Sequence, residues 1–356
     1  MAKKPSYRNQ SGLDETRNAL KKLEPAARQA FFARKARADN TQRTYASAQR
    51  LYLAWCEANG YAALPGSPEQ VAGYLDYLAM EREHKPTTLR TYFAGIARYY
   101  RDAQGKDNCT QTDYVQNVLS GIQRTLAQRE VQAKALTVDL ISALIEASWA
   151  GGKPKGLQAL RDRALILVGY ACAFRRSETA SLRRDEVTFE SRGVLLLLRS
   201  SKTDQLGAGR FVGMCHGEGR LCPVRALRAW LKAIPECEWV FPPITKAGKV
   251  EQRGMTDKSV NLVVKRMVEA AGMDSDGYSA HSLRAGMTTD LVASGMSTAQ
   301  VKQRTRHTSD GMVSRYVRNA TELDIDFTRA AMASRPVAMP QGGRGVGVAG
   351  PSGGGG

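Results

Sequence analysis

The sequence predicts a mainly α-helical protein with a small antiparallel β-sheet in its second half. Apolar residues recur at the spacing of amphipathic helices through most of the chain. Two short β-type runs, residues 187–189 and 194–198, flank Ser-Arg-Gly, which is typical of a hairpin. A polar stretch, residues 127–136, lacks a strong apolar stripe and separates the two halves. In a chain of 356 residues, this pattern favours two domains joined by a linker.

The first domain is expected over residues 39–126, after a polar, basic arm at residues 1–38 that contains one plausible helix. Its pattern predicts four amphipathic helices packed as a small bundle. One helix begins near Ser67, because Pro68 suits a first turn and Gln70 can complete a capping box. The apolar stripes of two of the helices are Val71, Tyr74, Leu75 and Leu78, and Leu89, Phe93, Ile96 and Tyr100.

Basic and amide side chains flank the apolar stripes of this bundle. Gln42, Arg43 and Arg90 are among them. The first two stand beside a stripe of Tyr45, Leu51 and Trp55. A solvated basic face explains one such helix, whereas its repetition on neighbouring helices favours a surface that rests on phosphates.

The second domain is expected over residues 137–334. Its elements, in order, are a helix opened by Thr137 and Asp139, a very apolar helix at 164–172, the hairpin, a third strand at 210–214, and helices after Pro223. Residues 335–356 form a glycine-rich tail with no core-forming residues, which we expect to be disordered.

The composition points to a polyanionic partner. Lys and Arg number 52 against 34 Asp and Glu, which gives a formal charge of +18 and a pI near 9.8. Such a field attracts nucleic acid, although other basic proteins share it. No apolar run is long enough to span a membrane, and the basic start MAKKPSYRNQ has no apolar stretch behind it. We therefore expect a cytoplasmic protein.

Six scattered cysteines fit reduced thiols better than a disulfide framework. Cys215, His216 and Cys222 resemble metal ligands, but the sequence has no CxxC, and a structural zinc site wants four closely spaced ligands. We favour loop and core cysteines, and we expect neither a metal nor a cofactor.

Four polar segments in the second half contain the candidate catalytic residues. Arg175 precedes Glu178 by three residues, Lys202 lies in SSKTD, His281 and Arg284 lie in HSLR, and RHTSDGMVSRYV follows. In this order and spacing, the segments resemble the catalytic domain of the tyrosine recombinases, or phage integrase family. His281 and Arg284 match its His-x-x-Arg box, and Tyr316 follows His307 by the family's nine residues. The first half resembles the family's helical (SAM-like) core-binding domain.

The residue types themselves suit phosphodiester cleavage. The planar guanidinium groups of Arg175 and Arg284 can hold both non-bridging oxygens where negative charge develops, and Glu178 is close enough to orient Arg175. The phenol of Tyr316 needs a proton acceptor because its ordinary pKa is about 10, and His281 is the first candidate. A phosphotyrosyl ester keeps the energy of the broken bond, so rejoining needs no ATP.

The resemblance implies the remaining roles. It places His307 beside the phosphate as a hydrogen-bond donor and makes Lys202 the general acid for the departing 5′ oxygen. It also places Lys258, near the start of a helix at Thr256, in the major groove, as it does Gln42, Arg43 and Arg90 of the first domain. The chain departs from the usual pattern at Arg306, where many relatives have glycine. That substitution leaves the local backbone open.

The resemblance implies a site-specific recombinase that forms a covalent 3′-phosphotyrosine and works as a homotetramer on two paired duplex sites. An apolar segment after the nucleophile could dock in a neighbouring subunit or pack on its own domain; its residues are Leu323, Phe327, Ala330 and Ala331. Two other functions stay open: a catalytically inactive DNA-binding regulator of the same fold, and a type IB topoisomerase.

Overall fold

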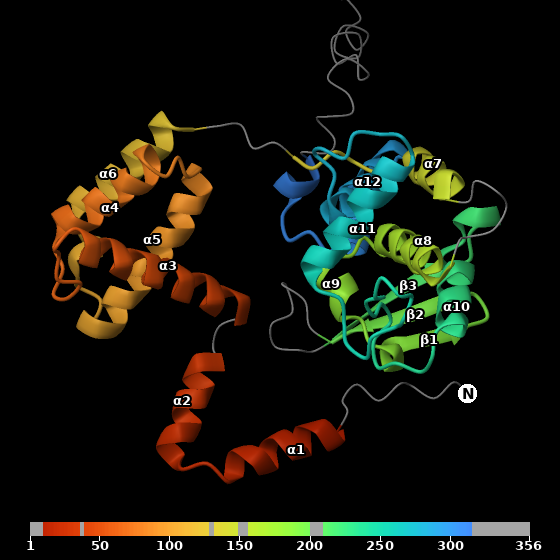
Figure 1. The fold of residues 1–356 in the computed structure, drawn as a ribbon, viewed down its shortest axis with the longest axis horizontal. Coiled ribbons are helices and arrows are strands. Elements are labelled where there is room, and N and C mark those ends of the chain that lie inside the picture. Colours follow the sequence, from red (N-terminus) through yellow and green to blue (C-terminus); the bar gives the residue numbers. More distant parts are fainter. Residues whose placement is uncertain (1–9, 36–38, 128–131, 149–155, 200–208, 315–356) are drawn as a thin grey trace, which may run out of the picture. The chain divides into compact units, whose positions relative to one another are not determined.

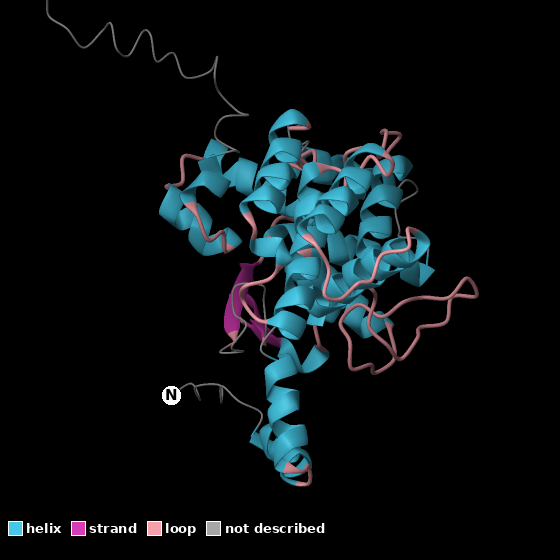
Figure 2. Cartoon of the chain, turned by 90° about the vertical axis from the view of Figure 1, so that its left-hand side faces the viewer, coloured by secondary structure: helices cyan, strands magenta, loops and turns pink. Residues whose placement is uncertain are grey.

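The computed structural model describes residues 10–35, 39–127, 132–148, 156–199 and 209–314. Helices dominate these residues, with one small sheet among them (Figure 2). The chain divides into two compact units: Met1–Gln132 with Leu197–Phe211, and Ala133–Leu196 with Val212–Gly356. Among the described residues, no helix is both long enough and apolar enough to cross a bilayer. The predicted fold class, mainly α with a small antiparallel sheet, is confirmed.

The N-terminal arm contains two helices in place of the one expected. Helix α1 spans Gln10–Lys21, and α2 spans Pro25–Lys35. Pro25 begins the second helix, where its fixed φ suits the first turn and its missing N–H is not needed. The arm has too few apolar residues for their spacing to predict the break between the two helices.

The first unit is built from α3 (Asp39–Ala58), α4 (Pro68–Met80), α5 (Pro86–Gln104), the 3₁₀ turn η1 (Cys109–Gln111) and α6 (Asp113–Thr125). Helix α3 packs on α5, and α4 packs on both α5 and α6. The apolar stripes predicted for α4 and α5 are buried in one core, which confirms them. Arg90 on α5 is exposed.

Helix α3 is rotated from the predicted orientation. Ala48, Tyr52 and Cys56 are its buried residues, whereas Leu51 is 44% exposed. The reason lies on α5, where Gly95 lets the two helices approach closely. A Cβ added at Gly95 would lie 2.9 Å from the Cβ of Ala48. This close approach decides which face of α3 turns inward.

Ser67 caps α4 as predicted, with its hydroxyl accepting the amide of Gln70 at 3.2 Å. The side chain of Gln70 does not serve the cap as we expected. Its amide enters the core and donates to Tyr52 Oη at 3.1 Å and to Cys56 Sγ at 3.1 Å. A buried tyrosine hydroxyl needs a partner, and Gln70 is the polar group within reach.

The second unit surrounds α8, which spans Gly156–Ala171 and packs against α7, α10, α11 and α12 (Figure 1). The other helices are α7 (Val138–Ser148), α9 (Arg176–Ser181), α10 (Pro223–Ala233), α11 (Asp257–Ala270), α12 (Ala280–Ala293) and α13 (Thr298–Thr305). Two 3₁₀ turns, η2 and η3, span Arg184–Glu186 and Gly219–Leu221. Three charged residues of α8, Arg161, Asp162 and Arg163, are buried. Asp162 pairs with Arg161 at 2.8 Å and with Arg266.

The sheet has the order β1-β2-β3, with strands Val187–Glu190, Gly193–Leu198 and Arg210–Cys215. Strands β1 and β2 are antiparallel, with Val187 opposite Leu196 and Glu190 opposite Gly193. This register is the predicted hairpin. Its turn falls at Ser191 and Arg192, and the third strand lies where the sequence predicted it.

The end of the predicted linker, residues 134–136, is hydrogen-bonded to residues at and just before the start of α12. The amide of Lys134 donates to Gly277 O at 3.0 Å, and that of Leu136 donates to Ser282 O at 2.9 Å. Leu136 is fully buried. Gly286 makes room for it, because a Cβ at that position would lie 1.7 Å from the carbonyl oxygen of Leu136. The entry into the second unit is therefore attached to the helix that carries the His-x-x-Arg box.

Candidate active site

Helix α12 places His281 and Arg284 one turn apart at its N-terminal end. The hydroxyl of Ser279 accepts the amide of His281 at 3.2 Å, and the amide of Ser279 donates to the hydroxyl of Ser282 at 3.0 Å. This reciprocal cap fixes where the helix begins. His281 is exposed in the first turn, whereas Arg284 is 1% exposed.

Arg175 immediately precedes α9, and Glu178 lies in the first turn of that helix. Arg175 Nη1 donates to Glu178 Oε1 at 2.7 Å, and the Arg175 amide donates to Glu178 Oε2 at 2.9 Å. The predicted contact between the two is present. Burial acts to raise the pKa of Glu178, but Arg306 and Arg175 outweigh it and hold that pKa below its ordinary value. Glu178 is therefore an ionised, oriented carboxylate at neutral pH.

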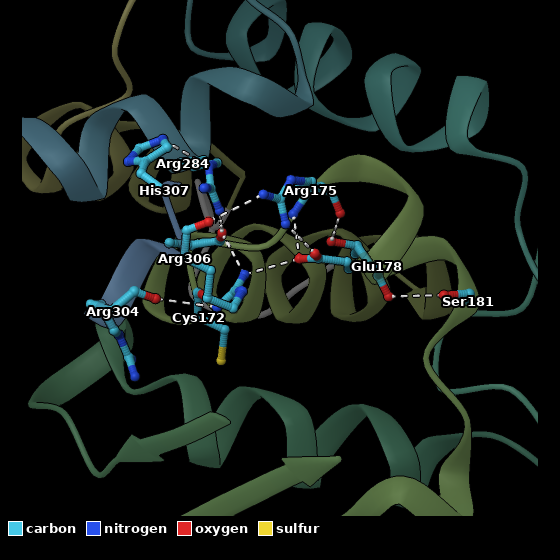
Figure 3. Close-up of polar contacts among 10 residues, drawn as sticks. Cys172, Arg175, Glu178, Ser181, Arg284, Arg304, Arg306 and His307 are labelled. Atoms are coloured by element: carbon cyan, nitrogen blue, oxygen red, sulfur yellow. Dashed lines mark hydrogen bonds and ion pairs between the residues drawn. The ribbon is translucent and has the colours of Figure 1, made fainter. Parts of the chain in front are cut away.

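Arg284 joins the end of α8 to His307. Its Nη1 donates to the carbonyl oxygen of Ala173 at 2.8 Å, and its Nε donates to His307 Nε2 at 3.3 Å. Figure 3 shows Arg284 and His307 side by side, next to the group formed by Arg175, Glu178 and Arg306. The His-x-x-Arg arginine and the second histidine position, 23 residues apart, thus meet directly.

His307 is a neutral imidazole in this arrangement. The hydroxyl of Thr305 donates to Val301 O at 2.7 Å and lies 2.9 Å from His307 Nδ1, so the network assigns the ring proton to Nδ1. His307 Nε2 is then the acceptor for Arg284. Burial, followed by the charges of Arg284 and Arg175, lowers the pKa of His307 to about 3.

Arg306, whose backbone the sequence left open, is left-handed, with φ 60° and ψ 37° at the end of α13. A glycine adopts this conformation without steric cost, whereas any other residue is strained there. The Arg306 side chain is buried. Its Nη2 donates to Glu178 Oε2 at 2.9 Å, and its carbonyl oxygen accepts Arg175 Nη2 at 3.3 Å (Figure 3). Arginine here thus occupies a backbone conformation that suits glycine, and it adds a cation inside the turn.

The second unit brings five of the predicted catalytic residues together. A continuous set of hydrogen bonds joins Arg175, Glu178, Arg284 and His307 through the backbone of Ala173 and the side chain of Arg306. The charge of His281 is among those that lower the pKa of His307. Lys202 and Tyr316 lie outside the described residues. The chain is helical at residues 310–314, and Val313 there is buried.

The candidate DNA contacts are distributed over both units. Gln42 and Arg43 lie on α3, Arg90 on α5, and Lys258 on α11. Arg43, Arg90 and Lys258 are exposed, as contacts with phosphate or bases require, and Gln42 is half-buried. Helix α11 begins after Thr256, whose hydroxyl accepts the amide of Ser259 at 3.1 Å, so the predicted start of that helix is confirmed.

Two residues of the site were not assigned a role from the sequence. Thr305 fixes the imidazole of His307, and Arg306 contacts Glu178. The signal for Arg306 was its departure from glycine, which marked the position without showing the direction of its side chain. Thr305 carries no such signal, because a threonine before two basic residues is unremarkable in sequence.

Comparison with known proteins agrees with this geometry. A sequence profile of the phage integrase family matches residues 134–322. An integrase/recombinase xerD homolog of Selenomonas ruminantium is 32% identical over 288 residues, covering 80% of this chain and 82% of that protein. Recombinase cre of Escherichia phage P1 is 23% identical over 310 residues, covering 81% of this chain and 87% of that one.

A solved structure shares the fold. The lambda integrase tetramer bound to a Holliday junction matches with a TM-score of 0.53 and 16% identity, covering 86% of this chain and 76% of that chain. The family profile covers more than half of this chain, and the Selenomonas relative covers most of it. The chain therefore belongs to the phage integrase family and is a tyrosine-type site-specific DNA recombinase.

Proposed function

We propose that Tyr316 cleaves one DNA strand by attacking its phosphodiester within a clamp formed by Arg175 and Arg284. The Tyr316 oxygen bonds to phosphorus as the bond to the 5′ oxygen breaks. His281 accepts the phenolic proton, and Lys202 supplies a proton to the leaving oxygen. Attack by a free 5′ hydroxyl reverses each step and joins a new strand. We also propose that the protein acts on DNA in the cytoplasm, as expected from its sequence.

One observation supports this proposal most: the described part of the site contains more positively charged side chains than negatively charged ones. Arg175, Arg284 and Arg306 lie around a single ionised carboxylate, that of Glu178. Arg175 and Arg306 share that carboxylate, so the three arginines and Glu178 together keep an excess of positive charge. A bound phosphodiester would supply negative charge there, and more of it in the transition state. Protein dipoles and cations held in place before reaction lower the barrier without reorganisation.

The first test removes the nucleophile. Tyr316→Phe should keep site binding but form no covalent DNA adduct, because only the hydroxyl is lost while the clamp remains. Footprinting would map the site, and a denaturing gel of a nicked duplex carrying it would detect the adduct. Adduct at the wild-type level would assign the nucleophile elsewhere, with Tyr278 as the next candidate. A wild-type protein without adduct would support an inactive DNA-binding regulator.

The general acid can be tested by changing the leaving group. Lys202→Ala should cleave ordinary DNA roughly a hundred- to ten-thousandfold more slowly, the contribution of a general acid. The variant should recover on a substrate with sulfur at the 5′ bridging position, because a thiolate leaves without a proton. Equal impairment on both substrates would instead indicate a lost phosphate contact.

Because His307 is neutral in the free protein, its proposed role as a donor to phosphate predicts that it gains a proton when DNA binds. Folding lowers the pKa of His307, so its neutral imidazole contributes to the stability of the folded protein. This contribution is complete above pH 6.5, the ordinary pKa of histidine, and is lost as the pH falls towards about 3. To donate to phosphate, Nε2 must gain a proton, and the phosphate charge favours that.

Nitrogen NMR of histidine-labelled Tyr316→Phe protein can observe this change. In the free protein between pH 8 and 5, His307 Nε2 should stay unprotonated, while exposed His281 provides an internal comparison. On addition of the mapped site, His307 Nε2 should become protonated. A ring that keeps Nε2 unprotonated on DNA would show that His307 serves as an acceptor and not as a donor.

We also propose that the active form is a homotetramer on two paired sites, because exchange of four strands needs four active sites. The lambda integrase tetramer on a Holliday junction supports this assembly. The segment proposed to dock in a neighbouring subunit, residues 323–331, lies outside the described residues. Its role in assembly is therefore a proposal from the sequence.

Two truncations test the assembly. Removal of residues 321–356 should leave adduct formation on isolated half-sites detectable but prevent tetramers on paired sites, as measured by sedimentation. Removal of residues 341–356 alone provides the matched control and should change neither result. Wild-type tetramer formation by the longer truncation would show that the segment packs on its own subunit.

A further inference from the structure

We propose that Arg306 is a positioning residue that holds both arginines of the clamp through Glu178 and the end of α8. This inference rests on the proposed function and adds a residue to its machinery. Only 3% of the Arg306 side chain is exposed. Both terminal nitrogens of its guanidinium group donate to protein acceptors, Nη1 to Cys172 O and Nη2 to Glu178 Oε2, so it acts through these neighbours.

The first neighbour is Glu178. Arg306 Nη2 donates to Glu178 Oε2 at 2.9 Å, while Arg175 Nη1 donates to the other oxygen, Oε1, at 2.7 Å. The carboxylate is thus held between the two guanidinium groups. Without Arg306, Arg175 would be the only arginine of the set on a buried carboxylate. Glu178 would then attract Arg175 more strongly than it does when Arg306 shares its charge. This stronger attraction would draw Arg175 away from the phosphate.

The second neighbour is the carbonyl end of α8. Arg306 donates to Cys172 O at 3.0 Å and to Ala173 O at 2.9 Å. Carbonyl groups at the end of a helix lack partners within it and carry partial negative charge, so a cation stabilises them. The Ala173 oxygen also accepts Arg284 Nη1 at 2.8 Å. One buried side chain thereby fixes the acceptor that orients Arg284 and the acceptor that orients Arg175.

The backbone of Arg306 supports a specific need for this side chain. Both Arg306 and Ala173 have left-handed backbones, with φ values of 60° and 47°. Arginine at such a position is strained, so glycine would be the easier residue for the turn alone. Arg306 instead places its guanidinium group between the two turns. Its carbonyl oxygen adds a third contact, by accepting Arg175 Nη2 at 3.3 Å.

Arg306→Gly tests the proposal while relieving the backbone. We expect DNA affinity close to the wild-type value and adduct formation about 10- to 100-fold slower in single turnover, the effect of a small misplacement of catalytic groups. Arg306 holds the pKa of Glu178 down, so without it Glu178 should become protonated at higher pH. The acidic limb of the pH–rate profile, where cleavage slows as the pH falls, should therefore move to higher pH. Free guanidinium ion should restore part of the rate by filling the vacated space.

Two further variants separate positioning from folding. Arg306→Lys keeps a charge near Glu178 and should return the acidic limb towards its wild-type position, with an intermediate rate. Arg304→Ala is the matched control. Arg304 donates to Gly213 O at 2.6 Å and also to Ala171 O near the same helix end, without a bond to Glu178. It should leave the acidic limb unmoved, even if unfolding occurs at a lower temperature.

A double variant measures whether the effect passes through Glu178. If it does, Arg306→Gly combined with Glu178→Gln should be slower by much less than the product of the two single effects. Wild-type protein without any adduct would refute the proposed function itself. Wild-type adduct together with an unchanged rate and acidic limb in Arg306→Gly would overturn only the positioning role. Multiplying effects in the double variant would overturn it as well.

Discussion

A single buried carboxylate holds the active site in place. Glu178 accepts the guanidinium groups of Arg175 and Arg306 on separate oxygens, and the backbone amide that precedes α9 on one of them. An ionised group that is 4% exposed is costly to bury unless its partners are already in position. The elements that supply these partners, α9 and α13, must therefore stay in register with the end of α8. Their arrangement and the charge of Glu178 stabilise each other.

The remaining geometry of the site follows from this arrangement. The carbonyl oxygen of Ala173, at the end of α8, receives Arg306 from one side and Arg284 from α12. Arg284 in turn reaches His307, whose ring Thr305 holds from behind. Segments distant in sequence thus share a small number of acceptors. In the described site, Arg284 donates to a backbone carbonyl, and Arg175 and Arg306 are held by Glu178 as well as by backbone carbonyls.

The sequence was informative where the local pattern decides the structure. The buried faces of α4 and α5, the hairpin and the start of α11 follow from periodicity and capping, which neighbouring residues determine. It failed where a distant residue decides. The rotation of α3 depends on Gly95 of α5, and the direction of Gln70 depends on the hydroxyl of Tyr52. The order of the catalytic motifs indicated a shared site, but the link through Arg306 depends on how the ends of α8 and α13 meet.

The fixed entry to the second unit has a consequence for protein engineering. Lys134 and Leu136 donate backbone hydrogen bonds to the region that begins α12, and the amide of Val138 donates to Asp290 Oδ2 at 2.8 Å. Lys134 and Leu136 belong to the linker predicted from the sequence, yet their backbone lies in the second unit. A chimaera that exchanges the binding domain for another should therefore be spliced before Lys134. A junction placed later would remove the backbone hydrogen bonds that hold the start of α12, the helix that carries Arg284. Such a hybrid would bind its new target but cleave it slowly.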